Sequence, residues 1–188
     1  MKYAAFRQLE TPRLLLRELC MEDAEAFFSR LGGSPEVTKH MLWVPHRDIS
    51  ETYASIQKAL NRYASGTGYR WAITLRHDAA LIGIIDLLGF DEHAGNCSFA
   101  YMLGKDHWNR GFATEALEAV FRFAFTEMDM ETITADHFAE NPASGAVMAK
   151  VGMRRLETIP EKYEKDGSRH DAVVYRITRA QWQQIHTK

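Results

Sequence analysis

The chain has 188 residues, of which 46% are hydrophobic and 26% charged, the composition of an ordinary globular protein that can bury one substantial core. Its formal net charge of −2 excludes a general attraction to nucleic acids or to anionic membranes. No apolar run approaches the roughly 18 residues of a membrane-spanning helix, and residues 1–7 lack a signal-peptide core, so we expect one cytoplasmic domain over 1–188.

The cysteine and histidine residues form neither a disulfide framework nor a metal-binding pattern. Cys20 and Cys97 are too few for such a framework, and neither belongs to a C-x-x-C pair. The eight histidines are scattered without the spacing of a zinc site. We therefore expect no structural or catalytic metal, and we expect Cys97 to be a small buried side chain.

The first half of the chain predicts short helical segments and then a run of strands. A strand comes first at 10–19, where arginines bracket three leucines, and a helix at 23–31 ends at Gly-Gly-Ser-Pro. A helical piece at 35–43 and a loop precede a longer amphipathic helix that begins at Ser50. Three strands joined by short reversals follow, which predicts an antiparallel meander. Their ranges are 69–76, 81–90 and 97–103.

The stretch that begins at His107 predicts a long buried helix. Apolar residues recur at steps of three and four positions, at Ala116, Leu117, Val120 and Ala124. This spacing places them on one helical face, which is typical of a helix packed against a sheet.

The turn before this helix carries the residue types that a phosphate site needs. Asn109 can cap the helix, Arg110 supplies a cation, and Gly111 lets a ligand approach the backbone. Small Ala113 keeps the first turn open, and the free N–H groups of a helix start bind anions such as a pyrophosphate. No Gly-Lys-Ser/Thr follows, so the turn is not a Walker loop.

The last third of the chain predicts more strands and helices of the same sheet. A strand at 132–137 precedes a helix that starts at Asn141 and Pro142, a good cap and a good first residue, and ends at Gly152. The remaining segments are a strand at 153–158, a polar turn at 161–170, a strand at 170–178 and a terminal helix from Arg179. The chain therefore predicts a single mixed α/β sheet. Within it, a strand, the phosphate-binding turn, the long helix and the next strand form one unit.

Trp108, Gly111 and Ala113 resemble motif A of the GCN5-related N-acetyltransferases, abbreviated GNAT, whose pattern is Q/R-x-x-G-x-G/A. The tryptophan departs from that pattern, and the alanine is permitted by it. Tryptophan at this place and the opening segment Glu10-Thr11-Pro12-Arg13-Leu14 are similar to the branch that contains the ribosomal-protein N-terminal acetyltransferases. The resemblance implies the GNAT fold, a mixed, mostly antiparallel sheet of about six to seven strands flanked by helices.

The resemblance also implies a function. The protein is expected to move an acetyl group directly from acetyl-coenzyme A to a primary amine, either a protein N-terminus or a small molecule, and to form a homodimer. No paired cysteine and histidine indicates a covalent acetyl-enzyme. The implied coenzyme-binding residues are Tyr101, Met102, Leu103, Trp108, Asn109, Arg110, Gly111, Phe112, Ala113, Thr114, Asn141, Ser144 and Lys150.

The proton donor to the departing thiolate is the first open assignment. The family's usual tyrosine corresponds to Met148, which cannot give a proton. The branch resembled here carries a serine that corresponds to Ser144, which makes Ser144 the candidate donor. The alternative is that Ser144 is an ordinary serine in the first turn of a helix.

The base and the acceptor pocket are assigned from position alone. Asp86 and Glu92 are the candidate carboxylates, because Ser98 replaces the family's strand glutamate. Taken alone, each of these carboxylates is more often a solvated charge at a turn or a strand edge. Trp43, His46 and Trp71 are the candidate acceptor residues.

Two other functions remain open on the sequence alone. A non-catalytic acetyl-coenzyme A sensor on the same fold is the first, because Met148 and Ser98 lack the family's functional groups. The second is a Rossmann-type nucleotide binder. This alternative is disfavoured, because the chain lacks the G-x-G-x-x-G fingerprint that the fold requires.

Overall fold

The computed structural model describes residues 4–65, 68–91 and 93–186. Its described strands form one sheet of eight strands in the order β1-β2-β3-β4-β5-β6-β8-β7. Among them, β5 and β6 alone pair in parallel. The strands are β1 (Leu9–Glu10), β2 (Leu14–Glu18), β3 (Tyr69–Leu75), β4 (Leu81–Asp91), β5 (Asn96–Leu103), β6 (Thr132–Phe138), β7 (Arg154–Lys165) and β8 (Ser168–Thr178).

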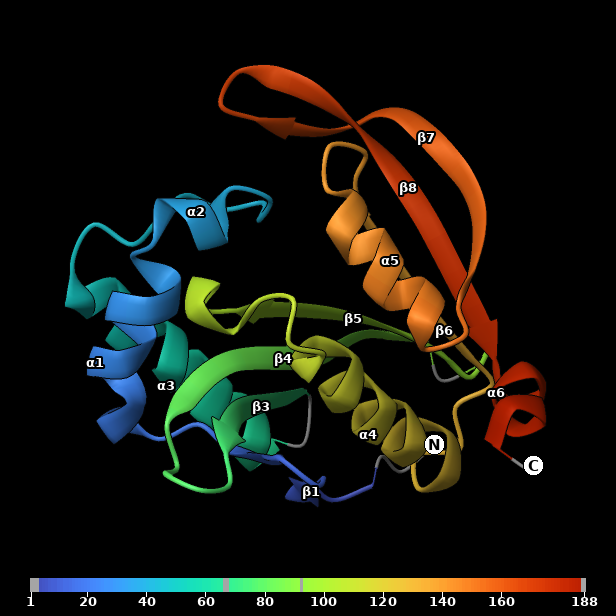
Figure 1. Cartoon of the computed structure of the whole chain (residues 1–188), viewed down its shortest axis with the longest axis horizontal. Helices are drawn as coiled ribbons and strands as arrows, with labels where there is room; N and C mark the ends of the chain where they lie inside the picture. The colour runs from blue at the N-terminus through green and yellow to red at the C-terminus, as the bar shows by residue number, and fades with distance from the viewer. Residues whose placement is uncertain (1–3, 66–67, 92, 187–188) are drawn as a thin grey trace.

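Helices cover both faces of this sheet (Figure 1). Helices α4 and α5 lie on one face, and α1 and α3 lie on the other. None of the helices in the described residues is long and apolar enough to cross a membrane. The helices are α1 (Ala24–Phe27), α2 (Pro35–Thr38), α3 (Ile49–Ser65), α4 (Phe112–Thr126), α5 (Pro142–Lys150) and α6 (Arg179–His186).

The core has one cluster of buried side chains on each face. The predicted apolar stripe of α4 packs into the larger cluster, where Ala116, Leu117 and Val120 are fully buried. Burial of this stripe holds α4 on the sheet and so fixes the position of its first turn. Cys97 is also buried there, as the sequence predicts.

Three segments differ from the sequence prediction. The helix expected at 23–31 is a four-residue α1 that continues as a π-helical turn over Phe28–Gly32. The sheet has eight strands because β1 adds a short edge strand. The polar turn expected at 161–170 is mostly strand, since β7 and β8 continue as a hairpin that reverses at Asp166 and Gly167. Both residues have positive φ, which is the conformation that favours Asp-Gly in tight hairpins.

The sheet splits in its middle. β5 and β6 pair only where Asn96–Ser98 lies beside Thr132–Thr134. Beyond that point β5 stays with β4, while β6 stays with β8 and carries the β7–β8 hairpin away from β5. Figure 1 shows this divergence as the open angle between β5 and α5. The edge of β5 over Phe99–Leu103 that faces away from β4 therefore has no neighbouring strand among the described residues.

Candidate functional site

The divergence of β5 and β6 contains a cleft of about 1230 Å³. Residues from both faces of the sheet line it, so the cleft passes between the two strands. The predicted coenzyme residues in its lining are Tyr101, Met102, Leu103, Trp108, Asn109, Gly111, Phe112, Ala113, Thr114, Asn141, Ser144 and Lys150.

The turn into α4 is built on backbone that only certain residues adopt. Gly111 has φ +80°, in the left-handed region, and it is the residue that caps the helix. Asn109 also has positive φ and lies two residues before the cap, so its predicted capping role is wrong. The first-turn N–H groups of Phe112, Ala113 and Thr114 have no partner within the helix, because helix geometry leaves them free. An anion at this turn would meet these donors and the positive end of α4.

A brace from the first strands holds this turn in place. The side chains of Thr11 and Arg13 both donate to the Glu115 carboxylate, at 2.6 Å each. Arg13 also donates to the carbonyl oxygen of Arg110 at 3.0 Å and stacks on the Phe112 ring. Burial alone would raise the pKa of Glu115, but these hydrogen bonds outweigh it and lower the pKa, which keeps the carboxylate charged.

Sequence reasoning missed this brace. The sequence offered one indication of these contacts: Thr11, Arg13 and Glu115 belong to the two segments that resemble the family.

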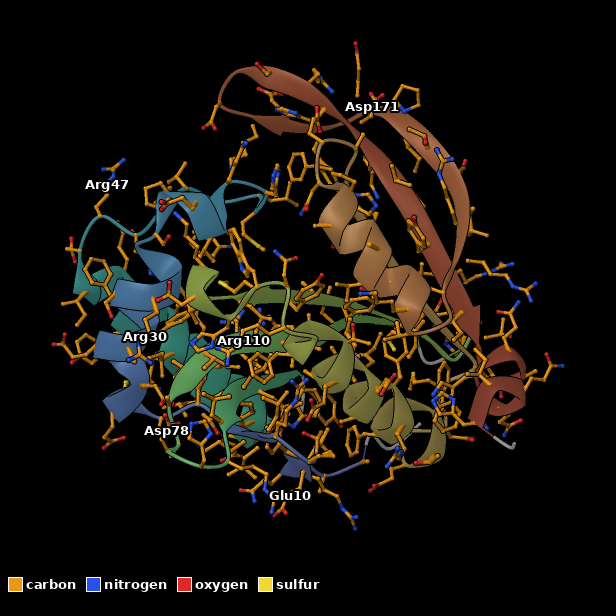
Figure 2. All side chains as sticks on the ribbon, viewed as in Figure 1. Glu10, Arg30, Arg47, Asp78, Arg110 and Asp171 are labelled. Atoms are coloured by element: carbon orange, nitrogen blue, oxygen red, sulfur yellow. The ribbon has the colours of Figure 1, made fainter. Side chains whose placement is uncertain are left out.

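Arg110 does not do what the sequence predicted. Its guanidinium lies over the Phe112 ring and lines a smaller hollow of about 410 Å³ together with Arg30 and Asp78. Figure 2 shows Arg110 on the α1 side of the start of α4, near Arg30. Among the described residues that line the main cleft, Arg110 is absent. The prediction that Arg110 places a cation in the cleft is therefore wrong.

Trp108 replaces the family's polar residue and finds a backbone partner. Its indole N–H donates to the carbonyl oxygen of Leu103 at 2.7 Å. This bond satisfies the last carbonyl of β5, so that group is not free for a ligand. The remaining free edge of β5 is Phe99–Met102.

Tyr101 and Ser144 meet across the cleft. The Tyr101 hydroxyl donates to Ser144 Oγ at 3.4 Å, and burial raises the pKa of Tyr101, so the phenol stays protonated at neutral pH. Asn141 caps α5 through its side-chain oxygen, which accepts the backbone N–H of Ser144. The Ser144 side chain is therefore not needed for the cap and is free to act in the cleft.

Of the predicted acceptor residues, Trp43 lines the cleft. His46 does not, because its Nδ1 lies 2.7 Å from the hydroxyl oxygen of buried Thr52 and its ring packs against Trp43. Trp71 is completely buried between β3 and α4, and its indole N–H donates to the carbonyl oxygen of Arg7 at 2.7 Å. The predictions that His46 and Trp71 contact the acceptor are therefore wrong.

The predicted base Asp86 is a structural residue. It points to the α3 face of the sheet and accepts two hydrogen bonds from Arg70, at 2.7 and 3.2 Å. Its side chain is 10% exposed and does not line the cleft. The assignment of Asp86 as base is wrong for that reason. Glu92, the other candidate, lies outside the described residues.

We expect Asp86→Asn to lower stability without changing the chemistry. The change leaves the guanidinium of Arg70 nearly buried and without its counter-ion, which typically costs about 3 kcal/mol. Chemical denaturation measures this loss, and thiol-release kinetics should give an unchanged kcat and an unchanged KM for the amine. The double variant Arg70→Met/Asp86→Leu removes both charges and should regain much of the stability. An Asp86→Asn protein as stable as the parent but slow in turnover would restore Asp86 as a candidate base.

A second carboxylate, which the sequence analysis did not select, does line the cleft. Asp136 on β6 accepts hydrogen bonds from Lys162 and Tyr163 of β7, and all three residues line the cleft. The only sequence signal was strand alternation, which places Asp136 on the face opposite to buried Ile133 and Ala135. Within the described residues, no group of three or more His, Cys, Asp or Glu side chains is arranged to hold a metal ion.

Comparison with known proteins agrees with the geometry of this cleft. Residues 13–154 match the family model of the acetyltransferase (GNAT) domain. The chain is similar to the uncharacterized N-acetyltransferase YoaA of Bacillus subtilis, with 29% identity over 93% of this chain and 98% of that protein. It is also similar to the ribosomal protein uS5-alanine N-acetyltransferase of Escherichia coli, with 25% identity over 93% and 92% of the two chains.

The fold has solved counterparts as well. A crystal structure of a GNAT-family acetyltransferase from Bacillus anthracis superimposes with a TM-score of 0.84, at 22% identity, over 93% of this chain and 99% of that one. At this identity the likeness establishes the fold, while the family model covers more than half of the sequence. The predicted resemblance is thus confirmed, and this chain belongs to the GNAT family of acetyltransferases.

Proposed function

We propose that this protein transfers the acetyl group of acetyl-coenzyme A directly to a primary amine. Ser144 donates a proton to the departing thiolate, and Tyr101 supports Ser144 through a hydrogen bond. The observation that carries the proposal is the Tyr101–Ser144 hydrogen bond in the cleft, between the free edge of β5 and α5. The amine is that of a protein N-terminus or of a small molecule.

The residues of the cleft fit the coenzyme. The start of α4 offers free N–H groups and a glycine without a side chain, which suits the pyrophosphate. The free backbone of Phe99–Met102 suits the amide groups of the pantetheine arm, as a further strand would. Lys150, at the last turn of α5, lines the same cleft and supplies a cation for a phosphate.

Proton transfer in this reaction runs from the amine nitrogen to the sulfur. The neutral amine attacks, the C–N bond forms and the C–S bond breaks; the nitrogen then gives up one proton, the thiolate takes one from the Ser144 hydroxyl, and the proton from nitrogen restores that hydroxyl. The Ser144 hydroxyl faces the cleft and receives a hydrogen bond from Tyr101, which makes it a better donor to a developing anion.

A covalent acetyl-cysteine is not part of this mechanism. Burial raises the pKa of Cys97 to about 12, so its thiol is not ionised at neutral pH. Cys20 lies beside Asp23 and Arg17 at the start of the first helical segment and does not line the cleft. Direct transfer between bound substrates is the simpler route.

The test separates an enzyme from a sensor. Calorimetry with acetyl-coenzyme A measures binding, and release of free thiol in the presence of peptides and small amines measures transfer. An enzyme gives both signals, whereas tight binding without amine-dependent thiol release over the whole panel would favour the sensor. The homodimer stays a prediction of the family resemblance, and light scattering at micromolar concentration tests it.

A further inference from the structure

Three polar residues form a cluster on the wall of the cleft opposite to α4 and α5. Asp136 on β6 uses one carboxylate oxygen for the ammonium of Lys162 and the other for the hydroxyl of Tyr163. The Asp136 side chain is 22% exposed and that of Lys162 is 34% exposed. The carboxylate is therefore accessible from the cleft, but it is occupied by a primary ammonium group of the chain itself.

Lys162 and Tyr163 differ in how easily each can leave Asp136. Lys162 lines the cleft with a long side chain, and a lysine loses rotamer freedom when it is held in one place. Burial and the hydrogen bond to Asp136 both raise the pKa of Tyr163, so the phenol remains a donor. Tyr163 thus keeps the carboxylate in position when Lys162 departs.

The backbone that carries Lys162 is fixed. At the tip of the same strand, Lys165 donates to the carbonyl oxygens of Thr38, Lys39 and Met41, at 2.8, 2.9 and 2.7 Å. These bonds tie the β7–β8 hairpin to the segment after α2, and Figure 1 shows the hairpin reaching over toward α2. Departure of Lys162 from Asp136 therefore requires movement of its side chain and not of the tied hairpin tip.

The surroundings of Asp136 match an acceptor with one charge. The apolar lining of the same cleft includes Leu42, Trp43, Phe138 and Ile159. Among the residues that the structure describes, the charged lining of the cleft is balanced, with three carboxylates and three lysines. These residues are Glu36, Asp136 and Glu157, and Lys39, Lys150 and Lys162. A polyamine needs several carboxylates in excess, and an acidic acceptor needs an excess of cations.

We propose that Asp136 binds the protonated amine of an acceptor that carries a single positive charge on an apolar body, and that Lys162 occupies this place until the acceptor displaces it. The inference rests on the proposed acetyl transfer and names the class of its acceptor. Asp136 holds the amine as its ammonium form, and before attack the ammonium gives one proton to solvent water, which leaves the neutral amine as the nucleophile.

Amine binding to the folded protein loaded with coenzyme A tests this directly, with n-hexylamine as the probe. We expect Asp136→Asn to weaken n-hexylamine binding about 10- to 100-fold in calorimetry, because a charge-assisted hydrogen bond is lost. The KM of n-hexylamine should rise by the same factor with little change in kcat. Lys162→Met should instead strengthen binding, because the competing ammonium is gone. The matched control Glu157→Gln removes one carboxylate from the same cleft and should change binding less than about 2-fold.

Several results would overturn the inference. They are unchanged n-hexylamine affinity in folded Asp136→Asn, equal losses in Asp136→Asn and Glu157→Gln, and tighter binding of spermine than of n-hexylamine. If Asp136→Asn does not fold, Lys162→Met still decides, since unchanged or weaker amine binding there contradicts the displacement. Failure of acetyl transfer has a different signature, which is amine binding without thiol release in the parent protein.

Discussion

Gly111→Val is expected to weaken coenzyme A binding by at least about 100-fold while the protein stays folded. A Cβ at Gly111 lies 3.4 Å from Arg13 Nη2, so a branched side chain crowds the brace that holds this turn and disturbs the first N–H groups of α4 that a pyrophosphate would meet. Each lost charge-assisted hydrogen bond costs about 1.5 to 3 kcal/mol. The left-handed φ of +80° adds strain of about 1 to 3 kcal/mol for a residue with a Cβ. Calorimetry gives the affinity, and thermal melting gives the stability.

A matched glycine separates backbone strain from loss of the binding site. Gly167, at the tip of the β7–β8 hairpin, has φ +74° and no atom within 4 Å of an added Cβ. Gly167→Val therefore carries similar strain far from the start of α4, so it should lower the melting temperature and leave coenzyme affinity unchanged. If folded Gly111→Val bound coenzyme A like the parent, the coenzyme would not lie at this turn.

Local patterns were sufficient to predict the centre of the molecule. The spacing of Ala116, Leu117 and Val120 reports helical periodicity directly, and the structure buries all three. Gly111 was singled out because it lacks a side chain, and it has the positive φ that such a turn requires. These features depend on residues close together in the chain, so sequence reasoning reaches them.

The direction in which strand residues point was harder to predict. Trp71 and Asp86 lie on central strands that helices cover on both faces. Residues 69–75 of β3 and 81–87 of β4 are nearly all buried, so these stretches show no polar face. The sequence did predict the hairpin between these strands, and its register places Arg70 directly opposite Asp86. Cross-strand pairing of opposite charges could therefore have identified the ion pair.

The acceptor wall depends on contacts that no local pattern reports. Asp136 and Lys162 belong to β6 and β7, which are separated in the sheet by β8. Their meeting requires the long β7–β8 hairpin, which the sequence analysis treated as a polar turn. The alternating polar residues of Glu161–His170 fit an exposed two-stranded ribbon, and Asp166-Gly167 was the turn signal within it.

Ser144→Ala is expected to slow turnover about 10- to 1000-fold while the affinity for acetyl-coenzyme A stays nearly the same. An interaction with the departing thiolate develops mainly in the transition state, so its loss lowers kcat rather than ground-state binding. The α5 cap is made by Asn141 and the backbone of Ser144, which keeps the helix start intact in the variant. Turnover with the best amine, coenzyme affinity and melting temperature together measure these effects.

Tyr101→Phe shows whether the two hydroxyls act as one unit. If Tyr101 supports the Ser144 hydroxyl through their hydrogen bond, Tyr101→Phe should lower kcat, and the double variant should be little slower than Ser144→Ala alone. Ser29→Ala is a matched control, since it removes a serine hydroxyl that donates to the carbonyl of Glu25 in another helical segment. It should leave turnover unchanged. Full activity of folded Ser144→Ala would remove Ser144 from the mechanism and leave water as the proton source for the thiolate.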